Sequence, residues 1–534
     1  MPPLNSIQKS FLALSISNAL VAMPTDAATI NVGANCSLID AIESANTDTS
    51  VGMCGQGLGA DIIVLPANHV ASYTAGIFSY LSTAGYTYDS ALPTITSDVT
   101  LQGTAPFNAV IERAGTTAEF RVLAVEANAS LSLEFITVRG GKLSGPNSSG
   151  AGIYANEANL DLQFSTISNN QANRAAGIDL QYCSNFYVDD SIITNNSAST
   201  FSGGVYAKDP ATVSITNSTI SANSSGSSGA GIMIIGYGTD VGVSDSRIFD
   251  NKIDNPALGE VGGGIYVLGV TLNLTDVTLF SNLAFNGGGL SAEDSTVVIN
   301  KSTLSGNTAL ADGGAIQGDN TLLEITRSTI FGNTAIGEAG GINQIDGGSI
   351  KIRNSTLSGN IAATGSALSS AAATVEIRGS TIYDNSTTAI GVEAASVLLA
   401  ALPDVLVNTI IAGSSLVDCN FGVGLPTFPN AASWFEDASC DGVGQGKPLL
   451  NPLMDNNDGL LNSTLTHAPS LGSGVLGIAD TGVCALYGAI DQRGAARGAI
   501  TCDIGAVEGS VAGAFDETCF VVKAANGNVI TFCL

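Results

Sequence analysis

The fold of this chain is decided by the stretch IKIRNSTLSGN, residues 350–360, which recurs in nine copies. Its general form is Φ-x-Φ-x-x-S-T-Φ-x-x-N, where Φ is an apolar residue. All nine copies keep the asparagine and the three apolar positions, and eight keep the serine, with Val277 as the exception. The copies are spaced by 26, 27, 28, 31, 25, 26, 27 and 25 residues. They close on Asn170, Asn196, Asn223, Asn251, Asn282, Asn307, Asn333, Asn360 and Asn385.

A repeat of this length is typical of a solenoid. Within each copy apolar and polar residues alternate, as in Val213-Ser214-Ile215 and Leu272-Asn273-Leu274, which is the period of a β-strand. Sustained helical spacing and the ladder of a leucine-rich repeat are absent, and the period is too short for a propeller blade. We therefore predict an all-β, single-stranded right-handed parallel β-helix, with about 27 residues and two or three short strands per coil.

The nine asparagines are expected to stack from coil to coil. Each amide can then donate a hydrogen bond to the next coil, worth about 1 kcal/mol, and asparagine tolerates the left-handed conformation of a tight corner. Glycine pairs recur between the copies, as in Gly203-Gly204 and Gly340-Gly341. They would serve corners with positive φ or a close backbone approach. Ligand binding is the alternative role for the asparagines, but their equivalence in all nine copies favours a structural role.

The charge balance excludes one class of partner. The 534 residues carry a net charge of −28 with only 18 lysines and arginines, so the surface repels nucleic acid. We expect a monomer without a cofactor. Calcium is the alternative, and Asp455–Gly459 is calcium-like. That segment lacks the spacing and the later glutamate of an EF-hand, which favours a plain turn.

The start of the chain predicts export. Residues 1–27 have the features of a signal peptide, with Lys9, an apolar run from Phe11 to Met23 and small residues at the cleavage site. No later apolar run reaches the roughly 18 residues of a membrane-spanning helix. We therefore expect an exported protein, extracellular or on the surface of a bacterium, with the periplasm as the alternative.

Cysteine usage also favours an oxidising compartment. Eight of the nine cysteines lie in close pairs outside the repeats, and local pairing is the simplest of the connectivities that the sequence allows. The disulfide candidates are Cys36 with Cys54, Cys419 with Cys440, Cys484 with Cys502, and Cys519 with Cys533. We expect Cys183, which lies alone in the repeats, to be a buried inert thiol. A zinc site is the alternative, although no CxxC pair or nearby histidine supports it.

Residues 28–91 are predicted to form an N-terminal cap and the first strands. Ser37 and Asp40 have capping-box spacing, so a short helix should lie over the open end of the solenoid, with one face formed by Leu38, Ala41, Ile42 and Ala45. Residues 30–66 resemble the N-terminal CSLREA domain of secreted bacterial β-helix proteins. The resemblance is carried by Cys36-Ser37-Leu38, Ala41-Ile42, Cys54 with its glycines, and Asp61–Pro66. Ile39 and Asp40 stand where that family has Arg and Glu.

The β-helix is predicted over residues 92–415, and the composition changes at 416. In residues 416–510, Asp491-Gln492-Arg493-Gly494, Arg497 and Cys502–Glu508 resemble the signature of choice-of-anchor Q proteins. The proteins of that family are expected to be β-helices that are secreted or lie on the cell surface, and their terminal anchors vary. We expect Arg493 to pair with Asp491 or Asp503 and to close a disulfide-rich C-terminal cap, with a small functional site as the alternative. Residues 511–534 should form a hairpin around Asn526-Gly527.

No catalytic constellation is evident, and fold alone does not establish function. Asp189-Asp190 is the adjacent acidic pair of the repeats, but neighbours in a strand face opposite sides, and Asp190 occupies a turn slot. The two histidines, His69 and His467, lie outside the good repeats. We therefore predict no catalytic, cofactor-binding or metal-binding residues.

The favoured function is an exported, non-catalytic β-helix protein that binds glycans or another cell surface. The repeats also resemble those of polymorphic outer-membrane adhesins, at Gly313–Ile316 and Ile330–Asn333. The alternatives are a polysaccharide lyase or glycoside hydrolase on the same fold, and a structural spacer.

Overall fold

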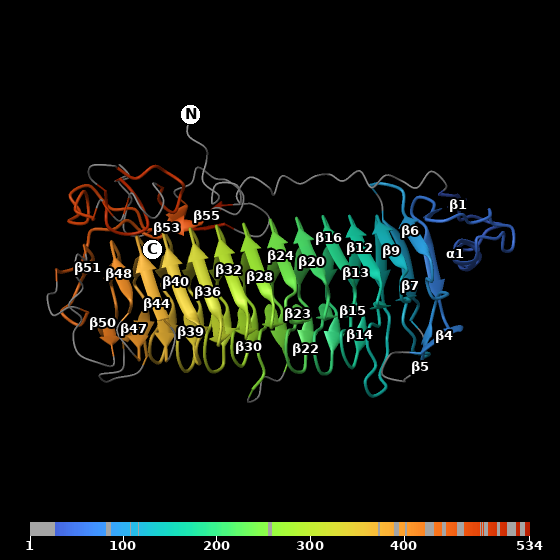
Figure 1. Ribbon diagram of the computed structural model, residues 1–534, viewed down its shortest axis with the longest axis horizontal. Helices are drawn as coiled ribbons and strands as arrows, with labels where there is room; N and C mark the ends of the chain where they lie inside the picture. The colour runs from blue at the N-terminus through green and yellow to red at the C-terminus, as the bar shows by residue number, and fades with distance from the viewer. Residues whose placement is uncertain are drawn as a thin grey trace.

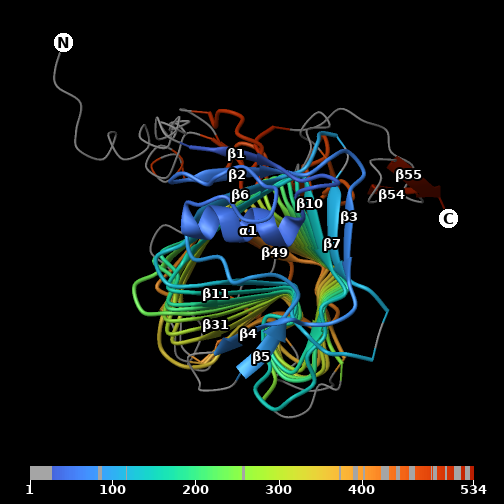
Figure 2. The same cartoon turned by 90° about the vertical axis from the view of Figure 1, so that its right-hand side faces the viewer.

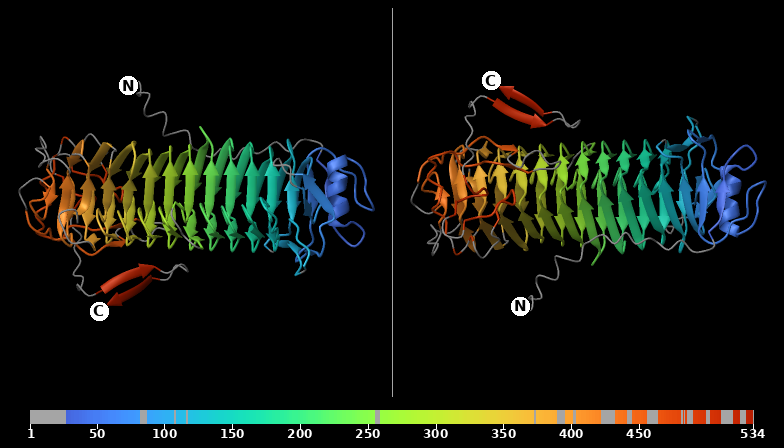
Figure 3. Two further views of the ribbon diagram at one scale, coloured as in Figure 1. Left: turned by 90° about the horizontal axis from the view of Figure 1, so that it is seen from below. Right: turned by 90° about the horizontal axis from the view of Figure 1, so that it is seen from above.

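The computed structural model describes residues 27–81, 87–106, 108–115, 117–254, 259–371, 374–388, 395–400, 403–421, 432–440, 445–455, 464–480, 482, 484, 490–498, 502–509, 519–523 and 529–533. Short strands stack in parallel along one axis (Figure 1). Figure 3 shows the same stack from below and from above. The predicted parallel β-helix is therefore confirmed. The predicted signal peptide lies outside the described residues, apart from Ala27.

The stretch that identified the repeat forms one coil with four strands. β39 (Ile342–Gln344) precedes β40 (Ser349–Arg353), β41 (Thr356–Ser358) and β42 (Ile361–Ala362). Each pairs in parallel with its counterparts in the neighbouring coils. We name the resulting sheets by these strands: sheet I contains β40, sheet II β41, sheet III β42 and sheet IV β39.

Among the described residues, sheets I and II have 14 strands each, sheet IV has 12 and sheet III has nine. The prediction of two or three strands per coil was too low for the central coils. Sheet III was missed because its strands have only two residues, too few for alternation to be recognised in the sequence. Sheet I begins with β1 (Thr29–Asn31) and β2 (Asp61–Val64) and ends with β48 (Val405–Val407).

The core follows from the alternation in each strand. In β40, Ile350 and Ile352 are fully buried, whereas Lys351 between them is partly exposed. Because parallel pairing keeps the register, the buried positions of successive coils lie above one another and form one continuous apolar core. Strands stack roughly 4.8 Å apart, so each coil is covered by its two neighbours.

The N-terminal end of the solenoid is covered by a helix, as predicted. Helix α1 (Leu38–Thr47) lies across this end and packs against β1, β2 and β6 (Asp98–Gln102) (Figure 2). Its N-cap residue Ser37 accepts a hydrogen bond from the Asp40 backbone N–H. The face named from the sequence is buried, and the Cys36–Cys54 disulfide closes the cap.

The corners of the coils differ from the prediction in one respect. The ladder asparagines do not adopt positive φ. The residues before them do, as at Asp250 (φ 54°) and Ser281 (φ 55°). A second left-handed corner precedes the repeat serine, as at Asn354 (φ 46°). The ladder side chain must point inward to stack, so the residue before it makes the turn.

The C-terminal end extends beyond residue 415, where the sequence placed the end of the β-helix. β50 (Val417–Phe421) belongs to sheet IV and β51 (Trp434–Phe435) to sheet II. Disulfides join Cys419 to Cys440 and Cys484 to Cys502. β54 (Cys519–Lys523) and β55 (Val529–Cys533) form an antiparallel hairpin with Cys519 opposite Cys533. The Cys519–Cys533 bond and the Asn526-Gly527 turn lie outside what the structure describes.

Candidate functional surface

The nine repeat asparagines form a buried ladder between sheets II and III. Asn251 Nδ2 donates to Asn282 Oδ1 at 3.1 Å, and Asn282 Nδ2 donates to Asn307 Oδ1 at 3.0 Å. The same Asn282 Nδ2 also donates to the carbonyl of Ile248, while its Oδ1 accepts the backbone N–H of Asn251. These hydrogen bonds use both amide hydrogens and the oxygen of each central asparagine, which leaves no free polar atom for a ligand.

The glycine pairs are explained by this ladder rather than by positive φ. A Cβ on Gly204 would lie 3.1 Å from the Asn223 amide nitrogen, and one on Gly289 would lie 3.1 Å from the Asn307 Cγ. The same added atoms would come within 2.6 Å of backbone carbonyls in the next coil. The pair is therefore required by close approach, the second of the two expected reasons.

The repeat serines form a second buried ladder, which was not recognised from the sequence. The backbone N–H of Ser302 donates to Ser328 Oγ at 3.1 Å, and that of Ser328 donates to Ser355 Oγ at 3.1 Å. Val277 has no hydroxyl to accept from Ser246, so the ladder is interrupted there. The occurrence of this serine in eight of nine copies was the available signal.

The adjacent acidic pair of the sequence does not form a site. Asp190 is an exposed residue in a left-handed turn (φ 45°). Asp189 lies on the outer face of sheet I in β16 (Asn185–Asp189), where it accepts a hydrogen bond from Thr216 Oγ1 at 2.5 Å. Burial raises the pKa of Asp190 and the charge of Asp189 raises it further, but Asp189 is already engaged by Thr216.

The structure brings different carboxylates together on sheet I. Asp161 in β12 (Asn159–Gln163) lies in the coil between those of Glu134 and Asp189, and on the same outer face. Burial raises the pKa of Asp161, the hydrogen bond from Gln163 lowers it, and the charges of Glu134 and Asp189 raise it further. Sequence reasoning missed this trio because its members occupy different coils. Asp161 precedes Asn170 by nine residues and Asp189 precedes Asn196 by seven, so aligning the coils would have placed them two columns apart, on one face of the strand.

Three exposed tyrosines lie on sheet I or at its corners, and one of them, Tyr187, lies beside Asp161. Tyr187 pairs across the sheet with Asp161 and is 43% exposed. Tyr182, also 43% exposed, follows β15 (Ile178–Gln181) and leads into β16. Tyr237 follows β23 (Ile232–Ile235) two coils further on and is 77% exposed, with its ring against Gly269. We call Glu134, Asp161, Asp189, Tyr182, Tyr187 and Tyr237 the tyrosine–carboxylate face.

Polar contacts hold this face in place. The Lys208 ammonium donates to the Tyr182 hydroxyl at 2.7 Å and lies 4.9 Å from the centre of that ring. The Tyr187 hydroxyl donates to Asn185 Oδ1 at 3.2 Å, and Asn185 in turn donates to Asn159. The aromatic rings are thus partly ordered on a rigid sheet.

A C-terminal cover, defined as residues 464–480, 484, 490–498 and 502–509, packs on the outer face of sheet II in the last coils. It is coloured orange and red in Figure 1. Gln492 Nε2 donates to Thr329 Oγ1 at 3.0 Å, and its Oε1 accepts from Thr356 Oγ1 at 2.7 Å. Thr329 and Thr356 are fully buried, whereas their counterparts in earlier coils, such as Thr303, are partly exposed.

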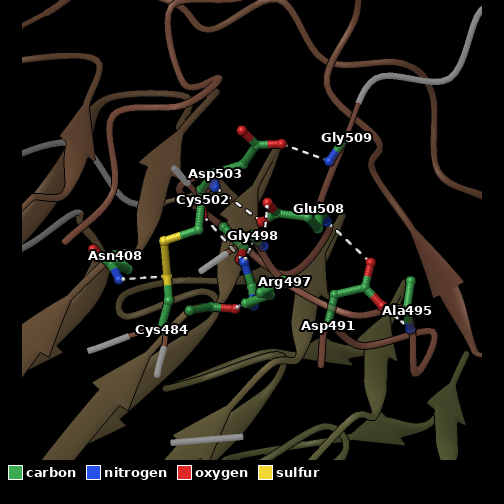
Figure 4. Close-up of polar contacts among 12 residues, drawn as sticks. Asn408, Cys484, Asp491, Ala495, Arg497, Gly498, Cys502, Asp503, Glu508 and Gly509 are labelled. Carbon is green, nitrogen blue, oxygen red and sulfur yellow. Dashed lines mark hydrogen bonds and ion pairs between the residues drawn. A yellow bond between two sulfur atoms is a disulfide. The ribbon is translucent and has the colours of Figure 1, made fainter. Parts of the chain in front are cut away.

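Arg497 anchors the cover to the solenoid (Figure 4). Its Nη2 donates to Asn354 Oδ1 at 3.1 Å and to the Gly505 carbonyl at 2.7 Å, and its Nη1 lies 3.5 Å from Glu508 Oε2. Burial lowers the pKa of Arg497, and the charges of Glu508, Asp491 and Asp503 oppose that shift. These bonds within the protein support a structural role for this segment.

The expected partner of Arg493 is Asp491, at 2.6 Å from Nη2 to Oδ2. Asp491 Oδ1 also accepts the backbone N–H of Ala495 (Figure 4). Asp503, the other expected partner, instead accepts the backbone N–H groups of Gly477 and Gly509. The arrangement closes the cover on itself, as in the structural interpretation of the sequence.

His467 contacts Ser358, which follows the third apolar position of its repeat, and the sequence did not suggest this contact. Its Nε2 lies 2.8 Å from Ser358 Oγ, and its Nδ1 lies 2.8 Å from the carbonyl oxygen of Asn451. A serine, an imidazole and an orienting acceptor have the order of a nucleophile and its base. Ser358 and His467 are only 4% and 5% exposed beneath the cover, which favours a structural contact over catalysis.

In the described part of the chain, no group of three or more His, Cys, Asp or Glu residues is arranged to hold a metal ion. Asp455 begins the calcium-like segment, and the rest of that segment lies outside the described residues. Cys183 is a buried free thiol whose pKa is raised by burial to about 11. None of the helices in the described residues is long and apolar enough to span a membrane.

The comparison with family models agrees with this architecture. The family model of the right-handed β-helix region matches residues 125–283 and 253–410, which together exceed half of the chain. No curated protein matches. Among solved structures, the crystal structure of pectate lyase Pel9A is similar at 14% identity, over 84% of this chain and 88% of that chain, with a TM-score of 0.31.

Proposed function

The chain belongs to the right-handed β-helix family, and from this premise we propose that it is an exported, non-catalytic protein that binds glycans along the outer face of sheet I. The binding site would be the tyrosine–carboxylate face. Export is supported by the three disulfides, because a reducing cytosol does not maintain such bonds.

The observation that carries this proposal is the exposure of tyrosines on a rigid sheet. A tyrosine supplies a flat apolar surface with a polar end and loses little side-chain entropy on binding. Tyr182 and Tyr237 project from corners two coils apart, or roughly 10 Å along the axis. A chain of sugar rings running parallel to the solenoid axis could contact both residues.

Polar side chains near the tyrosines also support glycan binding. Asn159, Asn185, Ser214 and Thr216 occupy outward positions of adjacent sheet I strands. Amides and hydroxyls both donate and accept hydrogen bonds, as sugar hydroxyls require. The net charge of −28 disfavours polyanionic glycans, so neutral sugars are the favoured ligands.

The test is a glycan panel applied to the purified chain with and without calcium. Binding and the release of reducing or unsaturated sugar ends are measured in the same samples. We expect binding without product release, and Tyr237→Ala should weaken it at least tenfold. Ile336→Ala is the matched control, because Ile336 is similarly exposed (65%) between sheets III and IV. Equal affinities of both variants and the parent chain would refute the assigned face, and a lack of any binding would favour the spacer.

A polysaccharide lyase or glycoside hydrolase is the second candidate, and Asp161 is the observation that favours it. A carboxyl whose pKa is raised by burial and by the charges of two further carboxylates resembles the arrangement of a general acid and its partner. Product release that is lost in Asp161→Asn but retained in Asp190→Asn would establish this function instead. Asp190 is the matched control because it is an exposed turn residue on the same coil as Asp189.

A further inference from the structure

The contact between His467 and Ser358 joins two parts of the molecule that are far apart in sequence. Ser358 ends β41 in sheet II, and His467 belongs to the C-terminal cover. The imidazole also packs against Tyr383 of the next coil, with ring centres 4.9 Å apart. The ring is therefore enclosed by the solenoid on one side and by the cover on the other.

The hydrogen bonds define the protonation state of this ring. The Asn451 carbonyl can only accept, so Nδ1 carries the proton and donates to it. Nε2 is then the acceptor, and the Ser358 hydroxyl donates to it. The imidazole is neutral in this arrangement, and its burial lowers the pKa of His467 to about 4.

The hydrogen bonds of the ring provide no negative charge to compensate a positive one. Among the described residues, the ring forms hydrogen bonds with Ser358 and Asn451 only, and neither is a carboxylate. The ring packs against Tyr383, and the Lys447 ammonium lies 5.7 Å from the centre of the Tyr383 ring. Glu436 also interacts electrostatically with Tyr383. Asp384 interacts electrostatically with that lysine. An imidazolium here would be buried without a hydrogen bond to a carboxylate, so its charge would favour exposure to water.

We propose that acidification releases the C-terminal cover from the solenoid, with protonation of His467 as the event that drives the release. The cover would then expose the part of sheet II that Thr329, Thr356 and Thr381 form. The Cys484–Cys502 disulfide lies within the cover, so the cover would remain covalently closed.

The direction follows from linkage. The pKa of His467 is lower in the docked state than in a solvated histidine, about 4 against 6.5, so the released state binds the proton more readily. Docking is fully favoured above pH 6.5 and is lost as the pH falls toward 4. The docking equilibrium should weaken about a hundredfold between pH 7 and pH 4. Burial raises the pKa of Asp418 to about 6, but its hydrogen bonds are with Glu436 and Asp437, which lie outside the cover.

Trp434 allows the release to be measured. It is the sole tryptophan of the chain, and Gly474 of the cover lies against its indole, so a Cβ there would be 2.4 Å from the ring. We would follow acrylamide quenching of Trp434 fluorescence from pH 7 to pH 4, with circular dichroism to show that the solenoid stays folded. We expect reversible exposure of Trp434 as the pH falls.

Two substitutions separate His467 from other acid effects. His467→Gln keeps an acceptor for Ser358 but cannot titrate, so its Trp434 should stay protected at pH 4. His69→Gln, the matched control, should behave as the parent chain does. Coincident quenching curves for His467→Gln and the parent chain would overturn the proposal, as would full protection of the parent chain at pH 4.

A direct measurement covers the case in which His467→Gln does not fold. The chain has two histidines, so selective ¹³C labelling of their rings gives two NMR signals, assigned through His69→Gln. We expect the His467 signal to titrate together with the release of Trp434. Titration of His467 near pH 6.5 while Trp434 remains protected would refute the proposal.

Discussion

The Asn ladder and the C-terminal cover both bury polar side chains, yet they do so in opposite ways. Each central ladder asparagine repeats the same hydrogen bonds, so its neighbours are chemically identical. In the cover, Gln492, Arg497 and His467 each make a different set of contacts with residues more than 100 positions away. Because the ladder repeats, it can be predicted from the sequence, and each rung contributes equally to its stability. The cover is instead attached to the solenoid by a few residues.

The largest expected effect is at Arg497. Replacing it by alanine removes the bonds to Asn354 and Gly505 and leaves Glu508 without its buried cation. We expect the free energy of cover docking to fall by about 3–5 kcal/mol. Urea unfolding followed by Trp434 fluorescence should then show an early transition of the cover, separate from that of the solenoid. Arg497→Lys keeps the positive charge but lacks the planar guanidinium that donates to several acceptors at once. We therefore expect a loss of docking free energy that is smaller than for Arg497→Ala. A single unshifted transition would show that Arg497 does not hold the cover.

The disulfide of the cover should rank second. Cys484→Ser combined with Cys502→Ser opens a loop with a sequence separation of 18, which corresponds to about 3 kcal/mol. Trp434 should become accessible at lower urea concentration than in the parent chain. The same double replacement of Cys36 and Cys54, at the opposite end, is the control and should leave the Trp434 transition in place. If the two double replacements shifted the Trp434 transition equally, the two ends of the solenoid would be coupled, and the cover would not be an independent attachment.

A central rung of the ladder should come next. Asn282→Ala leaves the buried backbone N–H and Nδ2 of Asn251 without their acceptor. The expected loss is about 2 kcal/mol in the unfolding free energy of the solenoid, measured by circular dichroism in urea. Asn333→Ala should cost the same within about 0.5 kcal/mol, since the rungs are equivalent. Asn273→Ala, on the exposed face of sheet I, is the control with almost no effect. Unequal losses at Asn282 and Asn333 would show that the rungs are not interchangeable.

The smallest effect is expected at the interruption of the serine ladder. Val277→Ser supplies a hydroxyl where Ser246 lacks an acceptor, a gain of about 1 kcal/mol. It also removes buried methyl groups from a fully buried side chain, a loss of similar size. We expect a net change within about 1 kcal/mol by the same urea measurement. Ser302→Val, which deletes an existing acceptor for Val277, should destabilise the solenoid clearly more.

Some features of the molecule could be predicted from the sequence, and others could not. The ladder asparagines and three of the four disulfide candidates appear where the sequence placed them, because repetition and close spacing are local properties. The trio of Glu134, Asp161 and Asp189 was not anticipated, since its members share a face only once the register between coils is known. Exposure of Tyr237 depends equally on what its neighbouring coils leave open.

The sequence by itself determined the parallel β-helix, its repeat of about 27 residues and the helical cap at its N-terminal end. The alternating apolar residues and the recurring asparagine are buried only when the coils stack on one another. Stacked coils form a solenoid with a single axis. Only the tertiary structure decided that the C-terminal cover folds back over sheet II and that His467 meets Ser358 there. Such contacts occur once, between segments of unrelated sequence, so no repeat in the sequence predicts them. They depend on which side chains the completed solenoid leaves uncovered.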